Sequence, residues 1–278
     1  MTFLHSLSAL TDHDLRSEVA AMRLSCCAYS FRDAFRSGDL TLEEFPELCR
    51  RIGCEGAELT AYYFPSTERA YLNKIKQSAH RAGISISGTA IGSDFANPDA
   101  VKRAEHVAMA REWIEHSVWL GAPTMRVFAG GVRQGQDERD AFDNAVSALR
   151  ECAELAYDSG VALALENHGG LTRTAEGTLD LLRAVDSPGL ALNLDFGNFE
   201  QDCYEQFEQC AIYAAATHAK PFTAGPAPGE RSRVDYQRVR EVMAAAGYRG
   251  WLAVEYEEAE ATEAIVGAFV EALSRVTG

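Results

Sequence analysis

Four short segments of the chain end an apolar run with a side chain that can bind a metal ion or move a proton. Glu166 follows VALAL, Asp195 follows LALNL, and Glu255 follows WLAV. His218 follows YAAAT near the end of another run. Carboxylates buried together repel one another and take up protons unless a cation neutralises them. Three carboxylates and one imidazole suit Mn²⁺, Mg²⁺, Co²⁺ or Zn²⁺, so these four residues are predicted to hold one divalent metal ion.

Each of these residues alone has an ordinary structural explanation. A glutamate at a strand end most often pairs with a cation, and a histidine in an apolar run is most often a hydrogen-bonded core residue. The joint pattern is harder to explain in this way, because the four residues end consecutive predicted strands. A barrel of parallel strands brings such ends to one face, where a metal site needs its ligands.

The elements that must position these residues follow from two alternating hydrophobic patterns. Strand-like runs are predicted at residues 24–31, 56–62, 85–91, 124–130, 161–168, 190–198, 212–220 and 250–257. Amphipathic helices are predicted between them, for example at 42–52, 68–82, 100–120, 138–157, 175–185 and 236–246. Eight strand–helix units, with no G-x-G-x-x-G turn after the first strand, favour a closed barrel. The predicted fold class is α/β, a single-domain (β/α)8 TIM barrel over residues 24–278 after an N-terminal extension at 1–23.

A second group of residues near the same strand ends is predicted to contact the substrate. His168 lies two positions after Glu166, on the same face of an extended segment. Arg126 is a charge inside an apolar strand; it contacts the substrate or balances the carboxylates, and a structural ion pair explains it equally well. The remaining candidates at the mouth of the barrel are Asn198, Lys220, Glu58 and Tyr62.

A long loop is predicted after the seventh strand. The segment 221–233 is rich in proline and glycine. In a barrel this segment belongs to the face that carries the active site, where loops bear function. We therefore expect it to cover the substrate.

Composition and charge exclude several classes of protein. The 278 residues are 47% hydrophobic and 24% charged, which fits one barrel-sized soluble enzyme. The net charge of −15 argues against nucleic acid as a partner. Neither a membrane span nor a secretion signal is expected, because apolar runs are short and the N-terminus lacks a basic start. Seven cysteines without a C-x-x-C pair indicate reduced thiols and a cytoplasmic location.

The order of the motifs resembles the xylose isomerase-like superfamily of TIM barrels. The matching motifs are ENHGG from Glu166, DFGN from Asp195, HAK from His218 and EY from Glu255. This superfamily holds sugar phosphate isomerases and epimerases, hydroxypyruvate isomerase, inosose dehydratase and endonuclease IV. The resemblance implies metal ligation by these four residues, with Glu166 and Glu255 as the acid/base pair.

By this resemblance, the leading expectation is a metal-dependent isomerase or epimerase for a sugar, keto-sugar or polyol. A divalent ion, with Mn²⁺ first, would chelate a ketone oxygen and a neighbouring hydroxyl and stabilise the enediolate formed by proton removal. The same site fits a lyase or dehydratase acting on a keto-sugar, keto-glycoside or inosose, because elimination can follow the same proton abstraction. Asn198 stands where many epimerases carry histidine, and Pro221 where aspartate is common. The detailed reaction is therefore left open.

Two other classes of function fit the sequence less well. An endonuclease of this superfamily uses several zinc ions and histidines, but only His168 and His218 of the seven histidines end predicted strands. A non-enzymatic sugar-binding barrel would be favoured by a missing ligand, and all four are present. The expected partner is a small sugar or polyol, and the lack of a glycine-rich phosphate cradle favours an unphosphorylated one. The oligomeric state is left open by the sequence, although the exposed helices of barrels often pack against those of a second copy.

Overall fold

Eight parallel strands close into a barrel in the order β1-β10-β7-β6-β5-β4-β3-β2. The computed structural model describes residues 22–227 and 229–277 of the chain. The barrel strands are β1 (Arg23–Cys27), β2 (Gly56–Thr60), β3 (Ser85–Ala90), β4 (Thr124–Val127), β5 (Ala162–Glu166), β6 (Leu190–Asp195), β7 (Ala214–Ala219) and β10 (Trp251–Val254). The predicted single-domain (β/α)8 barrel is thus confirmed. The extension expected at residues 1–23 lies almost wholly outside the described residues.

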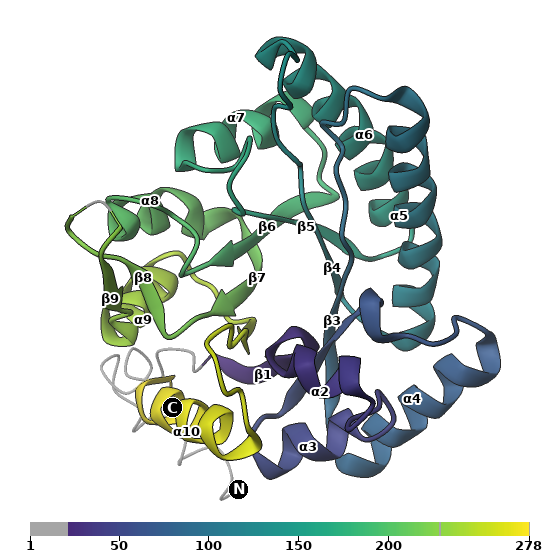
Figure 1. The fold of residues 1–278 in the computed structure, drawn as a ribbon, viewed down its shortest axis with the longest axis vertical. Helices are drawn as coiled ribbons and strands as arrows, with labels where there is room; N and C mark the ends of the chain where they lie inside the picture. The colour runs from purple at the N-terminus through teal and green to yellow at the C-terminus, as the bar shows by residue number, and fades with distance from the viewer. Residues whose placement is uncertain (1–21, 228, 278) are drawn as a thin grey trace, which may run out of the picture.

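Helices surround the strands and cover the outside of the barrel (Figure 1). They are α2 (Arg32–Ser37), α3 (Phe45–Arg51), α4 (Arg69–Ala82), α5 (Ala100–Leu120), α6 (Glu138–Asp158), α7 (Ala175–Val185), α8 (Cys203–Cys210), α9 (Tyr236–Ala245) and α10 (Glu263–Thr277). Short 3₁₀ turns lie at Ala28–Phe31, Ala61–Tyr63 and Ala211–Tyr213. Among the helices of the described part of the chain, none is both long and apolar enough to span a membrane.

The helix boundaries follow from capping residues in the sequence. Asp99 and Asp137 begin α5 and α6, and each side chain accepts hydrogen bonds from two backbone N–H groups of the first turn. Such caps satisfy donors that have no partner within the helix and contribute about 1 kcal/mol each. Gly83 and Gly121 end α4 and α5 in the left-handed conformation, as the glycine punctuation of the sequence indicates.

The strands are shorter than the predicted runs, and the difference lies at their carboxyl ends. The run predicted to reach residue 198 leaves the sheet after Asp195, and the run predicted to reach residue 168 leaves it after Glu166. The apolar parts of the runs pack between the sheet and the helices as one core. The polar parts become loops at the mouth of the barrel. The strand ends therefore deliver the polar residues to one face.

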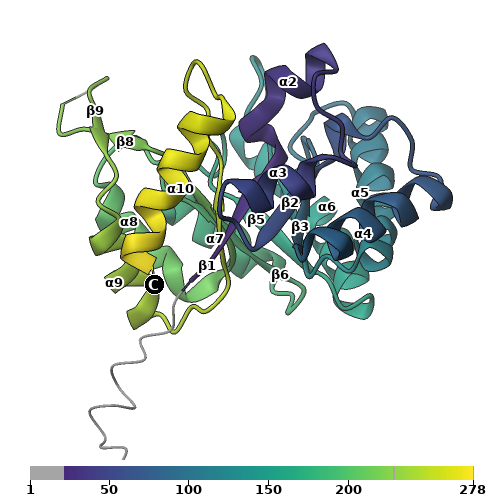
Figure 2. The same cartoon turned by 90° about the horizontal axis from the view of Figure 1, so that it is seen from below.

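The segment 221–233 differs from its predicted structure. It contains an antiparallel hairpin of two short strands, β8 (Phe222–Ala224) and β9 (Arg231–Arg233), rather than an irregular loop throughout. The guanidinium groups of Arg231 and Arg233 lie 4.6 and 5.7 Å from the centre of the Phe222 ring. Three-residue strands are too short to show an alternating pattern, and the proline and glycine content masks them. The hairpin projects from the barrel at the end where α10 begins (Figure 2).

Candidate active site

Glu166, Asp195, His218 and Glu255 form one buried cluster at the carboxyl ends of their strands. One ligand atom of each residue lies within 4.8 Å of the ligand atoms of the other three. Glu166 is 1% exposed and Glu255 is 4% exposed, while Asp195 and His218 are fully buried. Three carboxylates without water around them need a positive charge close by.

The register of the parallel sheet explains why these residues meet. Asp195 on β6 is paired with His218 on β7, and Glu166 on β5 is paired with Asn193 on β6. His218 is in turn paired with Ala253 on β10, two residues before Glu255. Residues paired across parallel strands point to the same side of the sheet. The four side chains therefore converge because of register, not because of loop conformation.

Glu58 on β2 fixes the orientation of the His218 ring. The Nε2 atom of His218 lies 2.9 Å from Oε1 of Glu58, which is 3% exposed. A neutral imidazole that donates its Nε2 proton to Glu58 presents the lone pair of Nδ1, and Nδ1 faces Glu255 at 3.3 Å and Glu166 at 3.5 Å. The expectation that Glu58 lines the mouth does not match this position. Glu58 lies behind His218 and supports it, as a carboxylate behind a ligating histidine does.

The cluster has the donors that a divalent metal ion requires. Asp195 Oδ2 and His218 Nδ1 are buried and make no hydrogen bond to the described residues. The other oxygen of Asp195 accepts the backbone N–H of Gly197 at 2.7 Å, which fixes the carboxylate plane. Ligand atoms that share one ion at about 2.0–2.2 Å lie at most about 4.4 Å apart, so a small contraction would complete the site. The oxygen and imidazole set therefore fits Mn²⁺, Mg²⁺, Co²⁺ or Zn²⁺.

Glu166 is held by one cation and two amides. Arg126 Nε lies 3.1 Å from Glu166 Oε2 in a buried ion pair, and the Arg126 guanidinium also donates to the Ile91 carbonyl at 2.8 Å. Asn198 and Asn193 donate to the two carboxylate oxygens of Glu166 at 3.0 and 3.2 Å. Arg126 thus lies in a buried ion pair with a carboxylate of the cluster, and of the three roles open from the sequence, contact with the substrate remains a prediction. Asn193 was not anticipated, although an amide between two leucines of a predicted strand was a usable signal.

Lys220 brings a second cation to the cluster from the end of β7. Its Nζ lies 3.3 Å from both Asp195 Oδ2 and Glu255 Oε2, and 2.5 Å from Glu257 Oε2. It also donates to Asn198 Oδ1 at 2.9 Å. Lys220 is 6% exposed. Because it is buried beside these carboxylates, its positive charge offsets part of their negative charge.

Burial and the two cations give the two glutamates different proton affinities. Burial raises the pKa of Glu166, with Arg126 opposing the shift. Burial acts in the same direction on Glu255, but His218 and Lys220 outweigh it and hold the pKa of Glu255 well below its usual range. Burial likewise raises the pKa of Asp195 to about 7. A metal ion bound to these carboxylates would lower the pKa of each of them.

A small cavity of about 90 Å³ opens beside the cluster. Glu166, Glu255, Arg126, Tyr62 and His168 are among its lining residues. His168 rests on the ring of Phe128, with 4.4 Å between the ring centres. Tyr29, Phe128 and Glu257 also line this cavity and were missed from the sequence. All three follow a barrel strand by a few residues, so the rule that selected Glu166 could have found them.

Comparisons with known proteins agree with the barrel fold. Residues 46–274 match the family model described as xylose isomerase-like TIM barrel. A 3-dehydroshikimate dehydratase of Bacillus anthracis is 26% identical over 245 residues, covering 82% of this chain and 80% of that protein.

Solved structures of other proteins have a similar fold. A D-psicose 3-epimerase of Clostridium cellulolyticum H10, crystallised with D-tagatose, superposes with a TM-score of 0.76 at 17% identity, covering 92% of this chain and 99% of that one. A xylose isomerase-like TIM barrel protein of Mycobacterium smegmatis, in complex with magnesium, gives 0.74 at 17% identity, covering 92% and 96%. At these identities the superpositions show the fold alone. The family model spans most of the chain, and the protein therefore belongs to the xylose isomerase-like TIM barrel family.

Proposed function

We propose that the protein is a divalent-metal-dependent isomerase or epimerase that removes and returns a proton next to the carbonyl of a small sugar. The observation that carries this proposal is the buried cluster of three carboxylates and His218. Two potential metal-ligand atoms in it, Asp195 Oδ2 and His218 Nδ1, make no hydrogen bond to the described residues. A bound divalent ion would polarise the substrate carbonyl and stabilise the negative charge that develops on its oxygen.

The two glutamates are the proton carriers in this proposal. Both Glu166 and Glu255 line the small cavity and approach the same ring nitrogen of His218. One glutamate removes the proton from carbon as the base, and the other returns a proton as the acid. Their surroundings differ, because Arg126 lies beside Glu166, whereas His218 and Lys220 lie beside Glu255. An epimerase needs these groups on opposite sides of the reacting carbon.

The remaining residues bind and orient the substrate. Arg126 keeps Glu166 in place and offers positive charge to a developing oxyanion. His168 lines the cavity and supplies a polar group for a substrate hydroxyl, and Tyr62 and Phe128 form an aromatic part of the wall. Asn198 holds Glu166 and Lys220 in place beside the substrate. The metal we expect is Mn²⁺, and the location we expect is the cytoplasm.

The test is exchange of the carbon-bound proton in deuterated water. Protein loaded with Mn²⁺ is incubated with ketoses such as fructose, and deuterium at the carbons next to the carbonyl is followed by NMR. We expect exchange in the native protein and its loss, by at least about 100-fold, in Glu166→Gln and Glu255→Gln. Glu241→Gln, at an exposed position of α9, is the matched control and retains exchange. Undiminished exchange in both active-site variants would contradict the assignment of the proton carriers.

A dehydratase is the second candidate, favoured by the sequence match to the 3-dehydroshikimate dehydratase. In such a reaction the base removes a proton next to the carbonyl, and an acid protonates the leaving hydroxyl, which departs as water. In this candidate reaction, Lys220, whose Nζ lies 3.3 Å from Glu255, would supply that proton. Incubation with 3-dehydroshikimate separates the two candidates. Dihydroxybenzoate formation without ketose exchange would favour the dehydratase, and the reverse result would favour the isomerase or epimerase.

A further inference from the structure

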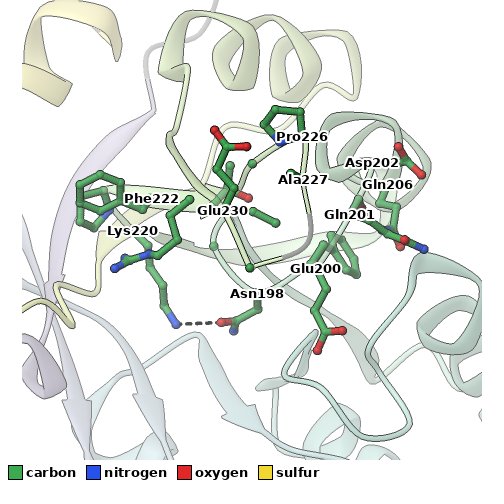
Figure 3. Close-up of a pocket in the computed structure, with 18 of the residues that line it drawn as sticks. Asn198, Glu200, Gln201, Asp202, Gln206, Lys220, Phe222, Pro226, Ala227 and Glu230 are labelled. Carbon is green, nitrogen blue, oxygen red and sulfur yellow. Dashed lines mark hydrogen bonds between the residues drawn. The ribbon is translucent and has the colours of Figure 1, made fainter.

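A groove of about 960 Å³ lies on the face of the barrel next to the cluster. Its walls are the segment that follows β6, the hairpin β8–β9 and the segment that follows β10 (Figure 3). The cavity at the cluster measures about 90 Å³, which is much smaller. Pockets for small molecules span about 300–1,000 Å³, so the groove approaches the upper end of that range. A single sugar at the cluster would leave most of this groove unused.

The groove borders the candidate active site through the side chains of Asn198, Lys220 and Glu257. Asn198 and Lys220 line its inner end and hydrogen-bond to each other there (Figure 3). The same two side chains contact Glu166 and Glu255 respectively. Glu257 lines both the groove and the small cavity. A molecule that reaches the cluster past these side chains would have its remaining part in the groove.

The chemistry of the walls favours a neutral ligand with hydroxyl groups. Five carboxylates line the groove against three cations, so an anionic ligand is disfavoured. Each of the three cations already pairs with a carboxylate: Arg173 with Glu200, Arg231 with Glu258, and Lys220 with Glu257.

Thr223 supplies the most specific signal. It lines the groove and is 3% exposed, and its Oγ1 makes no hydrogen bond to the described residues. This hydroxyl lies just behind the groove wall, and rotation of the Thr223 side chain about its Cα–Cβ bond would turn it toward a ligand hydroxyl. Phe222 and Pro226 add apolar surface nearby, against which the C–H face of a sugar ring can pack.

We propose that the groove binds a second sugar ring, so that the substrate is a ketose carrying a glycosyl group rather than a free monosaccharide. This inference rests on the proposed function for the reacting half of the molecule. It assigns the distal half to Thr223 and the hairpin. A phosphate in place of the second ring would meet the unfavourable charge of the walls.

The experiment compares ketoses that share one reacting end. Lactulose, leucrose and isomaltulose are fructose with a hexosyl group on O4, O5 and O6, and fructose 6-phosphate carries an anion at the same distal end. Deuterium exchange is measured for each with protein loaded with Mn²⁺. We expect kcat/KM for at least one disaccharide to exceed that for fructose by about tenfold or more, and fructose 6-phosphate to be the poorest substrate.

Two groove variants and one control test the location. Thr223→Val removes the hydroxyl at nearly constant shape, and Ala259→Trp fills the groove from an exposed position. Each is expected to lower the ratio of kcat/KM for the best disaccharide to that for fructose by about five- to tenfold. Ala272→Trp, exposed on α10 outside the groove, is expected to leave the ratio unchanged.

The outcomes separate the two proposals. Exchange with fructose, no preference for any disaccharide and an unaltered ratio in both groove variants would overturn the groove assignment alone. No exchange with any ketose would overturn the proposed function. In that case, calorimetric binding of the three disaccharides to native protein and to Thr223→Val tests the groove by itself. Weaker binding to the variant would support it, and equal binding or none would overturn it.

Discussion

Opposite charges are interleaved at the candidate site, and each cation has an identifiable carboxylate. Arg126 pairs with Glu166, and Lys220 lies between Asp195, Glu255 and Glu257. Charges buried in this way stabilise the fold only as complete sets, because removal of one partner leaves the other without compensation. The same residues serve the site, so their substitution affects stability as well as chemistry.

Loss of the Glu58 side chain is expected to weaken metal binding. Glu58→Ala removes the carboxylate that holds His218 Nε2 at 2.9 Å, and the ring can then turn its Nδ1 away from the cluster. We expect the Kd for Mn²⁺ to rise about 10- to 100-fold, measured by titration calorimetry. Glu55→Ala, at an exposed neighbouring position, is the control and keeps the native affinity. Equal affinity in all three proteins would contradict the role of Glu58.

Substitution of Arg126 is expected to destabilise the fold strongly. Arg126→Met leaves Glu166 buried without its cation and costs about 3–5 kcal/mol in the free energy of unfolding. The measurement is urea unfolding of the metal-free protein. Arg111→Met breaks the exposed ion pair with Glu151 and is expected to cost less than about 1 kcal/mol. A similar small loss for both variants would show that the buried pair contributes no more than an exposed one.

The longer helices were predictable because their apolar residues recur at helical spacing. The helices at Ala100–Leu120 and Ala175–Val185 begin and end at the predicted residues. The ligand strands were predictable because an apolar run ending in one polar residue specifies both a buried strand and its exit. The hairpin β8–β9 was not, since its strands have three residues each. The role of Glu58 depends on closure of the barrel, which brings β2 within reach of β7. No local sequence pattern encodes the short distance between Glu58 and His218.

The loop after β5 is held against the loop after β4 by close backbone packing. A Cβ atom at Gly170 would lie 2.4 Å from the Gly130 carbonyl oxygen and 2.9 Å from Gly131 Cα. Gly170→Ala must therefore separate these loops, one of which carries His168. We expect a loss of stability about 1–3 kcal/mol greater than that of Gly135→Ala, measured by thermal unfolding. Gly135 also has a positive φ but has open space around it. Gly135→Ala therefore measures only the strain of an alanine at positive φ. Equal losses would contradict the packing argument.

The described part of the barrel shares one apolar core that contains six cysteines, and the seventh, Cys27, is buried beside Glu255 at the candidate site. Burial raises the pKa of Cys152 to about 12 and that of Cys210 to about 12, and it raises the pKa of Cys49 well above its usual range. Thiolate, the reactive form, is therefore scarce at neutral pH in these side chains.

The burial of the cysteines predicts how the folded protein reacts with thiol reagents. At pH 8 without denaturant, we expect a disulfide reagent such as Ellman's to label well under about one thiol per chain within minutes. In denaturant all seven are expected to react. Rapid labelling of several thiols in the folded protein, with the circular dichroism unchanged, would contradict the closed core.

The most direct test of the metal centre is its stoichiometry. Protein is equilibrated in turn with Mn²⁺, Mg²⁺, Co²⁺ and Zn²⁺, freed of unbound ion by gel filtration, and assayed by elemental analysis beside the double variant Asp195→Asn, His218→Gln. We predict about one ion per native chain for at least one metal, with Mn²⁺ retained, and less than about one tenth of that in the variant. Native protein that retains none of the four metals, or a variant that retains as much as the native chain, would contradict the four-residue metal site.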